Sequence, residues 1–254
     1  MNFKTFYINK ADVGYQEVLS EDPLFEKFYL LENPNQEDIV AIPDGCVDIQ
    51  FIWEGEACQG YACGSFLEGK RSRVSNGNRC FGVKLRPGVR FEFLESADLL
   101  GRRIPLSEFL EVRRLESLLS TESDLGELVE TSSQFFHQQK LAPTHIITES
   151  ATRMLTDMPG PQKVTDVAEA LGYSSQYINH IFRHNIGLSM KKYAGIIRAQ
   201  AAISYLESKN VMDVVMDLGY YDQAHFIRDF KQHTSLTPKH YVEQLRYSQR
   251  RLIV

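Results

Sequence analysis

The chain has 254 residues, 43% of them hydrophobic and 24% charged, a composition typical of a globular protein long enough for two domains. No apolar run approaches the ~18 residues that a membrane-spanning helix needs. The polar start MNFKTFYINKADVGY lacks the apolar stretch of a signal peptide. These features predict a cytoplasmic protein that has no membrane partner.

The net charge of −5 is divided unevenly. Residues 1–142 carry 15 Lys and Arg against 23 Asp and Glu (15 − 23 = −8), whereas residues 143–254 carry 13 against 10 (13 − 10 = +3). An acidic half joined to a mildly basic half is typical of a regulatory domain fused to a DNA-binding domain. Because the basic excess is small, we expect specific contacts and dimerisation to provide most of the DNA affinity.

The first half contains short strand patterns. Residues 3–8 and 25–31 are aromatic-rich, and residues 38–53 read as a strand, a PDGC turn and a second strand with alternating polarity. Residues 57–63 and 79–85 predict further strands, separated by a long polar loop. The pattern predicts a half-buried β meander in a small barrel or sandwich.

Two polar features of this half predict ordinary turns. Asp44 and Asp48 flank the PDGC turn, where Asp side chains usually accept hydrogen bonds from nearby backbone N–H groups. The sequence KLRPG at 84–88 is favoured as a strand end and turn, with a ligand site as the alternative.

All of the cysteines lie in the first half. No histidine precedes His137, and the cysteine spacing does not match a zinc knuckle. We expect free thiols, mostly buried as small hydrophobic groups, with thiol sensing or metal binding as the alternatives. The cysteines are Cys46, Cys58, Cys63 and Cys80.

Leucine-rich segments with helical spacing follow from Ser96 to about residue 136. Their apolar side chains are expected to be core, although this region is also where a dimer surface would be sought. The residues concerned are Leu106, Leu110, Leu115, Leu118, Leu119, Leu125 and Val129. The segment QQKLAPT at 138–144 predicts a linker, which divides the chain into domains 1–142 and 143–254. A helix at 145–158 opens the second domain.

The second half contains two copies of one helical sequence pattern. VTDVAEALGYSS begins at Val164 and VMDVVMDLGYYD begins at Val211, 47 positions later (211 − 164 = 47). From Phe182 and Phe230 onward the offset is 48 (230 − 182 = 48), so the second copy gains one residue near 221–224. Arrays of repeats need about three copies to bury their faces, so two copies indicate a different architecture.

Each copy predicts a helix, a tight turn and a second helix. Gly172 and Gly219 sit where helices end in a left-handed residue, and Ser174 or Ser175 and Asp222 can cap the second helices. The pattern is that of a helix-turn-helix, whose second helix enters a DNA major groove. We place the first unit at about 164–188 and the second at about 211–236.

The outward faces of the two second helices carry side chains that we expect to read DNA. A solvated helix face is the alternative for any one of them taken singly, but the duplication favours DNA binding. Amide, imidazole and guanidinium groups bond base edges and phosphates, and Ala or Ile contacts thymine methyl groups. Ile227 is counted both among the inward residues of the second copy and in its outward stripe. The candidate DNA-contacting residues are Ser174, Ser175, Gln176, Tyr177, Asn179, His180, Arg183, Gln223, Ala224, Ile227, Arg228 and Lys231.

The proline-free segment 189–208 predicts the helix that joins the two units. A helix of about 20 residues is about 30 Å long, close to one DNA turn of about 34 Å. Two recognition helices at this separation would enter successive major grooves.

Residues 146–246 resemble the DNA-binding domain of AraC/XylS-type bacterial transcription regulators. The resemblance rests on LGYSSQYINHIFRHNIGLSMKKY and DLGYYDQAHFIRDFKQHTSLTPKHY. Met190 stands where the first copy often has proline, and Ser235 stands where the second often has glycine. The resemblance implies base contacts at the positions of Gln176, Asn179 and His180 and at 223, 224, 227 and 228.

IPDGCVDIQFIW and GVKLRPGVRFEFL resemble an N-terminal domain found on some regulators of this family. That resemblance implies a β-rich domain that senses an effector or dimerises. The overall expectation is therefore an α+β protein of two domains, a β-rich barrel or sandwich with trailing helices followed by an all-α double helix-turn-helix. Its expected partners are double-stranded DNA, a second copy of the chain, a small-molecule effector and RNA polymerase.

Other functions are weighed against this one. The sequence contains no nucleophile motif, P-loop or dinucleotide fingerprint, so no catalytic residue, metal or cofactor is expected. One alternative is a DNA-binding module fused to a cysteine-based chemical acceptor, which would need a low-pKa cysteine near basic groups, and Cys80 beside Arg79 is the nearest candidate. A protein-interaction module without DNA contacts is the other alternative.

Overall fold

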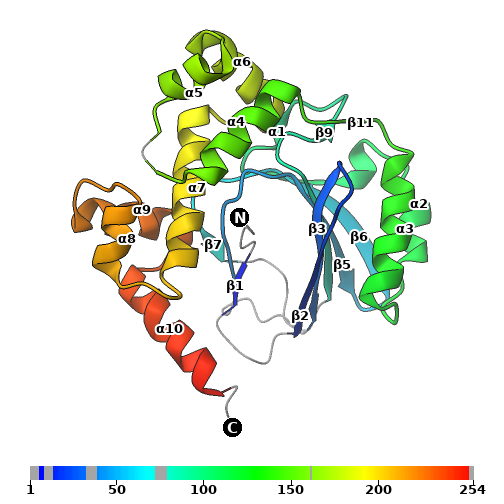
Figure 1. Cartoon of the computed structure of the whole chain (residues 1–254). Coiled ribbons are helices and arrows are strands. Elements are labelled where there is room, and N and C mark those ends of the chain that lie inside the picture. The colour runs from blue at the N-terminus through cyan, green and yellow to red at the C-terminus, as the bar shows by residue number, and fades with distance from the viewer. Residues whose placement is uncertain (1–5, 9–13, 33–38, 72–78, 161, 252–254) are drawn as a thin grey trace.

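The computed structural model describes residues 6–8, 14–32, 39–71, 79–160 and 162–251. Within these residues the first half is mainly antiparallel sheet and the second half is helical (Figure 1), so the predicted fold class is confirmed. The strands are β1 (Phe6–Ile8), β2 (Gly14–Leu19), β3 (Phe25–Glu32), β4 (Ile39–Ala41), β5 (Asp48–Glu54), β6 (Ala57–Cys63), β7 (Lys70–Arg71), β8 (Cys80–Leu85), β9 (Arg90–Phe91), β10 (Arg103–Pro105) and β11 (Leu141–Ala142). The helices among them are α1 (Ser96–Leu99), the 3₁₀ helix η1 (Leu106–Glu108), α2 (Arg113–Leu118) and α3 (Leu125–His137).

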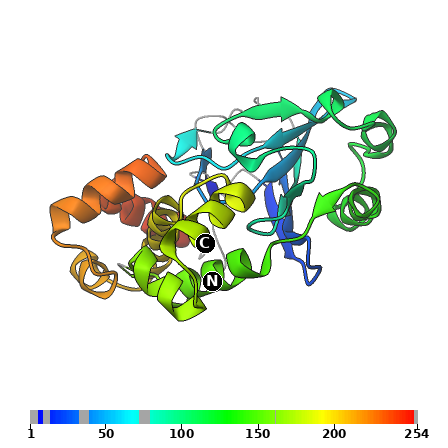
Figure 2. The ribbon, with the colours of Figure 1, turned by 90° about the horizontal axis from the view of Figure 1, so that it is seen from above.

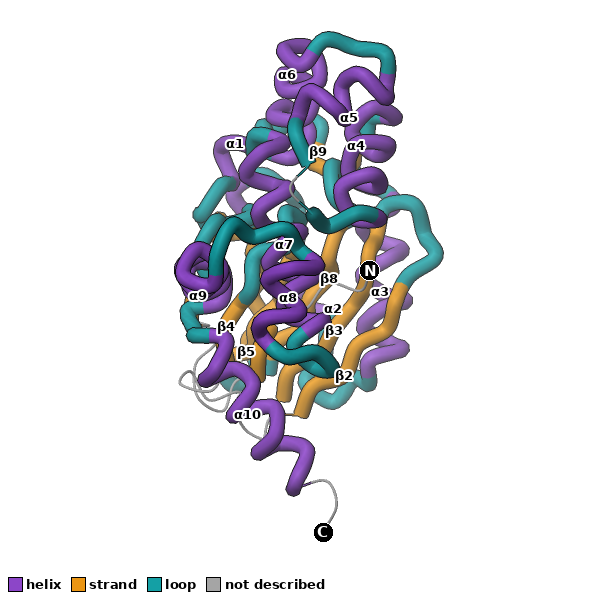
Figure 3. The backbone as a smooth tube through the Cα atoms, turned by 60° about the vertical axis from the view of Figure 1, so that its left-hand side comes forward, coloured by secondary structure: helices purple, strands orange, loops and turns teal. Residues whose placement is uncertain are grey.

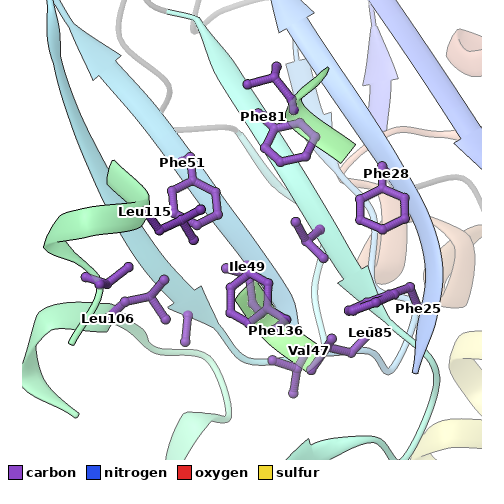
Figure 4. Close-up of a cluster of buried hydrophobic side chains, with 14 of the residues drawn as sticks. Phe25, Phe28, Val47, Ile49, Phe51, Phe81, Leu85, Leu106, Leu115 and Phe136 are labelled. Carbon is purple, nitrogen blue, oxygen red and sulfur yellow. The ribbon is translucent and has the colours of Figure 1, made fainter. Parts of the chain in front are cut away.

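A six-stranded antiparallel sheet in the order β10-β6-β5-β8-β3-β2 forms the main layer. Alternate side chains of β3, β5 and β8 point to one face, where Phe28, Phe51 and Phe81 pack together. Helices α2 and α3 cover this face with Leu115 and Phe136 (Figure 4). Most of the leucines at 106–129 therefore belong to the core, as predicted, while Leu118 is 57% exposed.

The predicted half-buried meander is wrong in two respects. The central strand β8 is buried on both faces, and β4 pairs with β1 and β7 in a separate three-stranded sheet and not with β5. The residues between β4 and β5 cross from one sheet to the other. Local alternation could not reveal this, because strand pairing depends on residues far apart in sequence.

Asp44, in this crossing, and Asp48, at the start of β5, behave differently. Asp44 Oδ1 accepts from the backbone N–H of Cys46 at 3.0 Å, as predicted, and its Oδ2 pairs with buried Lys84. Asp48 makes no such local bond: its Oδ2 accepts from the hydroxyl of Tyr29 at 2.6 Å and from Gln50 Nε2 at 2.9 Å. The predicted hydrogen bond from a nearby backbone N–H to the Asp48 side chain is therefore wrong. This side chain lies on the face of the sheet away from α2 and α3, where it contacts Tyr29 and Gln50.

The helical half lies on the other side of the sheet from α2 and α3 (Figures 1 and 2). Its two helix-turn-helix units lie at the two ends of α7 (Figure 3). The helices are α4 (Ile146–Asp157), α5 (Val164–Leu171), α6 (Ser175–Ile186), α7 (Met190–Tyr205), α8 (Val211–Asp217), α9 (Gln223–Thr234) and α10 (Pro238–Arg251). In the described part of the chain, no helix has both the length and the apolarity to cross a membrane.

The joining helix is shorter than predicted. It begins at Met190 after an N-cap at Ser189 and ends at Tyr205, which makes 16 residues and a length of about 24 Å. The core of the first unit includes Phe182 and Ile196. The core of the second unit includes Phe226 together with Val40 and Ile42 of the first half. The two halves thus share hydrophobic packing.

The predicted linker at 138–144 contains a short strand. β11 pairs with β9, and Thr144 Oγ1 donates to the carbonyl of Pro87 at 2.9 Å. This segment is thus attached to the first half, and the predicted boundary between residues 142 and 143 stays a prediction.

Candidate nucleic-acid interface

The first helix-turn-helix is set by its capping residues. Gly172 ends α5 with a left-handed backbone (φ 75°), and Ser174 Oγ accepts from the N–H of Tyr177 to begin α6. Ile178 and Phe182 are buried against α5 and α7. Predicted and observed elements agree here because caps and apolar spacing are local signals.

The second unit repeats this geometry. Asp222 Oδ1 accepts from the N–H of His225 at 2.6 Å to begin α9. Gly219 is left-handed (φ 62°), and the turn between Tyr220 and Asp222 contains the extra residue at Tyr221. The predicted insertion site is therefore correct.

Helix α9 is held by a polar network that sequence reasoning missed. Asp229 accepts from the Tyr220 hydroxyl at 2.6 Å and pairs with Arg198 of α7 at 3.4 Å, and the Arg198 guanidinium lies 4.4 Å from the Tyr220 ring centroid. Burial and Asp229 raise the pKa of Tyr220, which therefore stays a neutral donor. The spacing of residues along the sequence does not reveal this network, because Arg198 lies on a different helix from Asp229.

Most predicted DNA-contacting side chains lie on exposed faces of α6 and α9 or at the caps before them. A smaller group is half-buried at the edges of the two helices: Ser175, Asn179 and Ile227. The exposed group is Ser174, Gln176, Tyr177, His180, Arg183, Gln223, Ala224, Arg228 and Lys231. The outward stripes therefore exist as two separate surfaces, one on each unit.

Comparisons with known proteins agree with this geometry. A family model described as a helix-turn-helix domain matches residues 167–244. The regulatory protein SoxS of Salmonella typhimurium is 31% identical over 87 residues, which cover 34% of this chain and 81% of SoxS. The chain belongs to the AraC/XylS-type family of transcription regulators.

Two further matches to this AraC-type chain differ in how much of it they cover. YtdP of Bacillus subtilis, an uncharacterised HTH-type transcriptional regulator, is 32% identical over 83 residues, which are 32% of this chain, and the chain spans 11% of the length of YtdP. The structure of ToxT from Vibrio cholerae aligns with 95% of this chain and 98% of ToxT, with 12% identity and a TM-score of 0.45.

Exposed tyrosines add to the first recognition surface of this AraC-type domain. Tyr173 and Tyr177 are 46% and 44% exposed, and their ring centroids are 5.4 Å apart. Tyr173 was not among the predicted contacts, although its place in the turn before α6 was a usable signal. Large exposed rings beside a recognition helix can contact phosphates through the hydroxyl.

All four cysteine thiols of this AraC-type chain have a raised pKa. Burial raises the pKa of Cys58 and of Cys63 to about 12, and it raises the pKa of Cys46 and of Cys80 well above the ordinary thiol value. The cysteines are free thiols, of which Cys46 and Cys80 are buried and Cys58 and Cys63 are half-buried. Across the described ranges, no three His, Cys, Asp or Glu side chains are arranged to hold a metal ion.

Proposed function

We propose that this chain is a sequence-specific transcription regulator that reads two successive major grooves with α6 and α9. The observation that carries the proposal is the repeated geometry: two capped recognition helices, each with an exposed polar stripe, at the two ends of one helix. A solvated surface would not require the same arrangement twice.

The contacts follow from side-chain chemistry. Arg228 can bond a guanine through two N–H groups, and Gln176 can bond an adenine in the same bidentate way. His180 and Arg183 lie on the same exposed face of α6, and Lys231 continues the face of α9. The serines and tyrosine near the start of α6 contact phosphates in this proposal, while Ala224 and the edge of Ile227 contact thymine methyl groups.

A selection from random duplex DNA tests the proposal. His180→Ala and Arg228→Ala should each relax one segment of the recovered site and cost about 1–3 kcal/mol in binding. Arg114→Ala, an exposed arginine of α2, is the control and should bind like the wild type. If both helix variants recover the wild-type site with unchanged affinity, the assignment of these helices is wrong.

We further propose that a small polar effector binds the N-terminal domain, residues 1–142, on the face of the sheet away from α2 and α3. Tyr29, Gln50 and Asp48 form a hydrogen-bonded cluster there, with Cys63 Sγ 3.5 Å from Gln50 Oε1. Asp48 Oδ1 is buried and has no hydrogen-bond partner. A buried acceptor without a partner is costly, and a ligand N–H or O–H would satisfy it.

Thermal unfolding in the presence of a panel of sugars, polyols and amines tests the effector proposal. A ligand of this site should raise the midpoint of the wild type and lose that effect in Asp48→Asn. A ligand that stabilises both proteins equally would bind elsewhere.

Protein partners are proposals of the same kind. Exposed Met212 and Met216 are four residues apart on α8, at 54% and 76% exposure, and offer an apolar contact for RNA polymerase. Exposed Leu118 on α2 offers a contact for a second copy of the chain. Sedimentation of the chain at several concentrations measures the dimer directly.

The cysteine-acceptor alternative has little support. It requires a low-pKa thiol, whereas Cys80 is fully buried and burial raises its pKa. We therefore propose a regulator without enzymatic activity.

A further inference from the structure

The C-terminal end of α6 is attached to the first half of the chain. Ser96 Oγ donates to the carbonyl of Asn185 at 2.8 Å, and His184 lies 3.1 Å from Glu95 and 2.9 Å from Arg90. The carbonyls at a helix C-terminus lack partners within the helix. The first half therefore supplies a donor that the end of the first recognition helix needs.

The end of α9 is attached in the same manner, at a different place. The backbone N–H of Gly69 donates to the carbonyl of Gln232 at 3.0 Å, and Ser235 Oγ donates to the carbonyl of Gly69 at 2.6 Å. A Cβ on Gly69 would lie 2.6 Å from the carbonyl carbon of Thr234. Only a residue without a side chain allows this approach.

The two attachment points are joined to each other. Gly64 N–H donates to the carbonyl of Arg102 at 3.1 Å, and Gly101 N–H donates to the carbonyl of Ser65 at 2.8 Å. Residues 64–70 and 95–102 thus form one cross-linked piece, here called the bridge. Leu67 and Leu100, one from each segment, pack against the core of the first helix-turn-helix.

The bridge therefore connects the C-terminal end of one recognition helix to that of the other by a route independent of α7. Helix α7 joins the two units along the chain and contributes Ile196 to the core of the first and Ala202 to the core of the second. The bridge is a second connection between the two recognition helices, in addition to the packing of Val40 and Ile42 in the core of the second unit. It restricts how far α6 and α9 can tilt relative to each other.

We propose that the bridge sets the separation and tilt of α6 and α9, so that Ser96 and Gly69 are positioning residues for DNA recognition although they touch no DNA. This inference rests on the proposed function, because it assumes that both helices read one duplex. Its consequence is that the spacing between the two recognised segments depends on residues of the first half.

The test uses the whole 254-residue chain and pools of duplex DNA. In these pools the two segments recovered by the wild type are separated by spacers that range from a few base pairs shorter to a few base pairs longer than the wild-type spacer. Gly69→Ala and Ser96→Ala should each broaden the range of accepted spacers. Each should also lower affinity for the wild-type spacing about fivefold, the effect of losing about one hydrogen bond. Ala can adopt the backbone of Gly69, which is outside the left-handed region.

Matched controls separate positioning from general damage. Gly160→Ala adds a Cβ with no atom within 4 Å, and Ser117→Ala removes a hydroxyl that bonds a carbonyl of its own helix at 2.8 Å. Both should keep the wild-type spacing. Ser235→Gly, whose backbone suits glycine, covers the case in which Gly69→Ala fails to fold, and it should broaden spacing in the same direction.

The outcomes distinguish this inference from the proposed function. If the wild type selects one spacing and the folded bridge variants select it as sharply and bind it within about twofold, the bridge does not position the helices. If the wild type recovers no DNA sequence from the random pool, the proposed function is wrong, and the inference that rests on it is wrong as well.

Discussion

Gly187 and Ser235 occupy the same place in the two helix-turn-helix units, 48 positions apart (235 − 187 = 48). Each follows a recognition helix with a left-handed backbone, at φ 80° and 59°. Ser235 is the one non-glycine residue with positive φ among the described residues. The difference arises from what each residue meets: a Cβ on Gly187 would lie 2.7 Å from the carbonyl oxygen of Ser96, whereas the Ser235 side chain bonds Gly69.

This relationship predicts that substitutions at these two equivalent positions differ in their effect on the free energy of unfolding. Gly187→Ala should lower the free energy of unfolding by about 2 kcal/mol or more, since it adds left-handed strain and a backbone collision. Ser235→Gly should change it by less than about 1 kcal/mol, because relief of strain offsets one lost hydrogen bond. Urea unfolding of both variants measures the contrast, and equal losses would contradict it.

Asp48→Asn should stabilise the protein, with a gain that grows with pH. Burial raises the pKa of Asp48, although nearby Lys84 opposes the shift. Above the unfolded pKa of about 3.9, the native carboxyl holds its proton more tightly than the unfolded one, so its contribution to stability falls as pH rises. The free energy of unfolding of Asp48→Asn should exceed that of the wild type by more at pH 7 than at pH 4. A variant that is less stable than the wild type at pH 7 would contradict this account.

The free energy of unfolding should depend strongly on both residues of the buried pair of Lys84 and Asp44. Burial disfavours the charged lysine, but the carboxylates of Asp44 and Asp48 outweigh it and raise the pKa of Lys84. Lys84→Met should cost about 3 kcal/mol or more, because it leaves a buried carboxylate without its partner. The double variant with Asp44→Asn should recover part of that loss in urea unfolding. A double variant that loses the sum of both single losses would argue against direct pairing.

The four thiols should resist alkylation in the folded chain. Cys46 and Cys80 are buried, and burial raises the pKa of Cys58 and of Cys63 to about 12, so little thiolate forms near neutral pH. Iodoacetamide followed by mass spectrometry should label all four only after unfolding in denaturant. Fast labelling of native Cys80 would restore the chemical-acceptor alternative.

The helical half was predictable because its signals are local. Capping residues such as Ser174 and Asp222 and the glycine at 172 fix helix ends within a turn. The pairing of β4 and the roles of Lys84 and Gly69 were not predictable, because each depends on a partner at least 29 positions away (70 − 41 = 29 for Ala41 and Lys70), as Lys84 does on Asp44 (84 − 44 = 40). Gly69 lay in a segment read as a plain loop, yet it bonds the end of α9.

A hydroxyl-radical footprint of the 254-residue chain on its selected DNA site tests most directly whether α6 and α9 together read one duplex. We predict two protected segments on one face of the duplex, with centres about one helical turn apart. His180→Ala should weaken one segment and Arg228→Ala the other. A single protected segment, or two that both fade in either variant alone, would contradict reading by two separate helices.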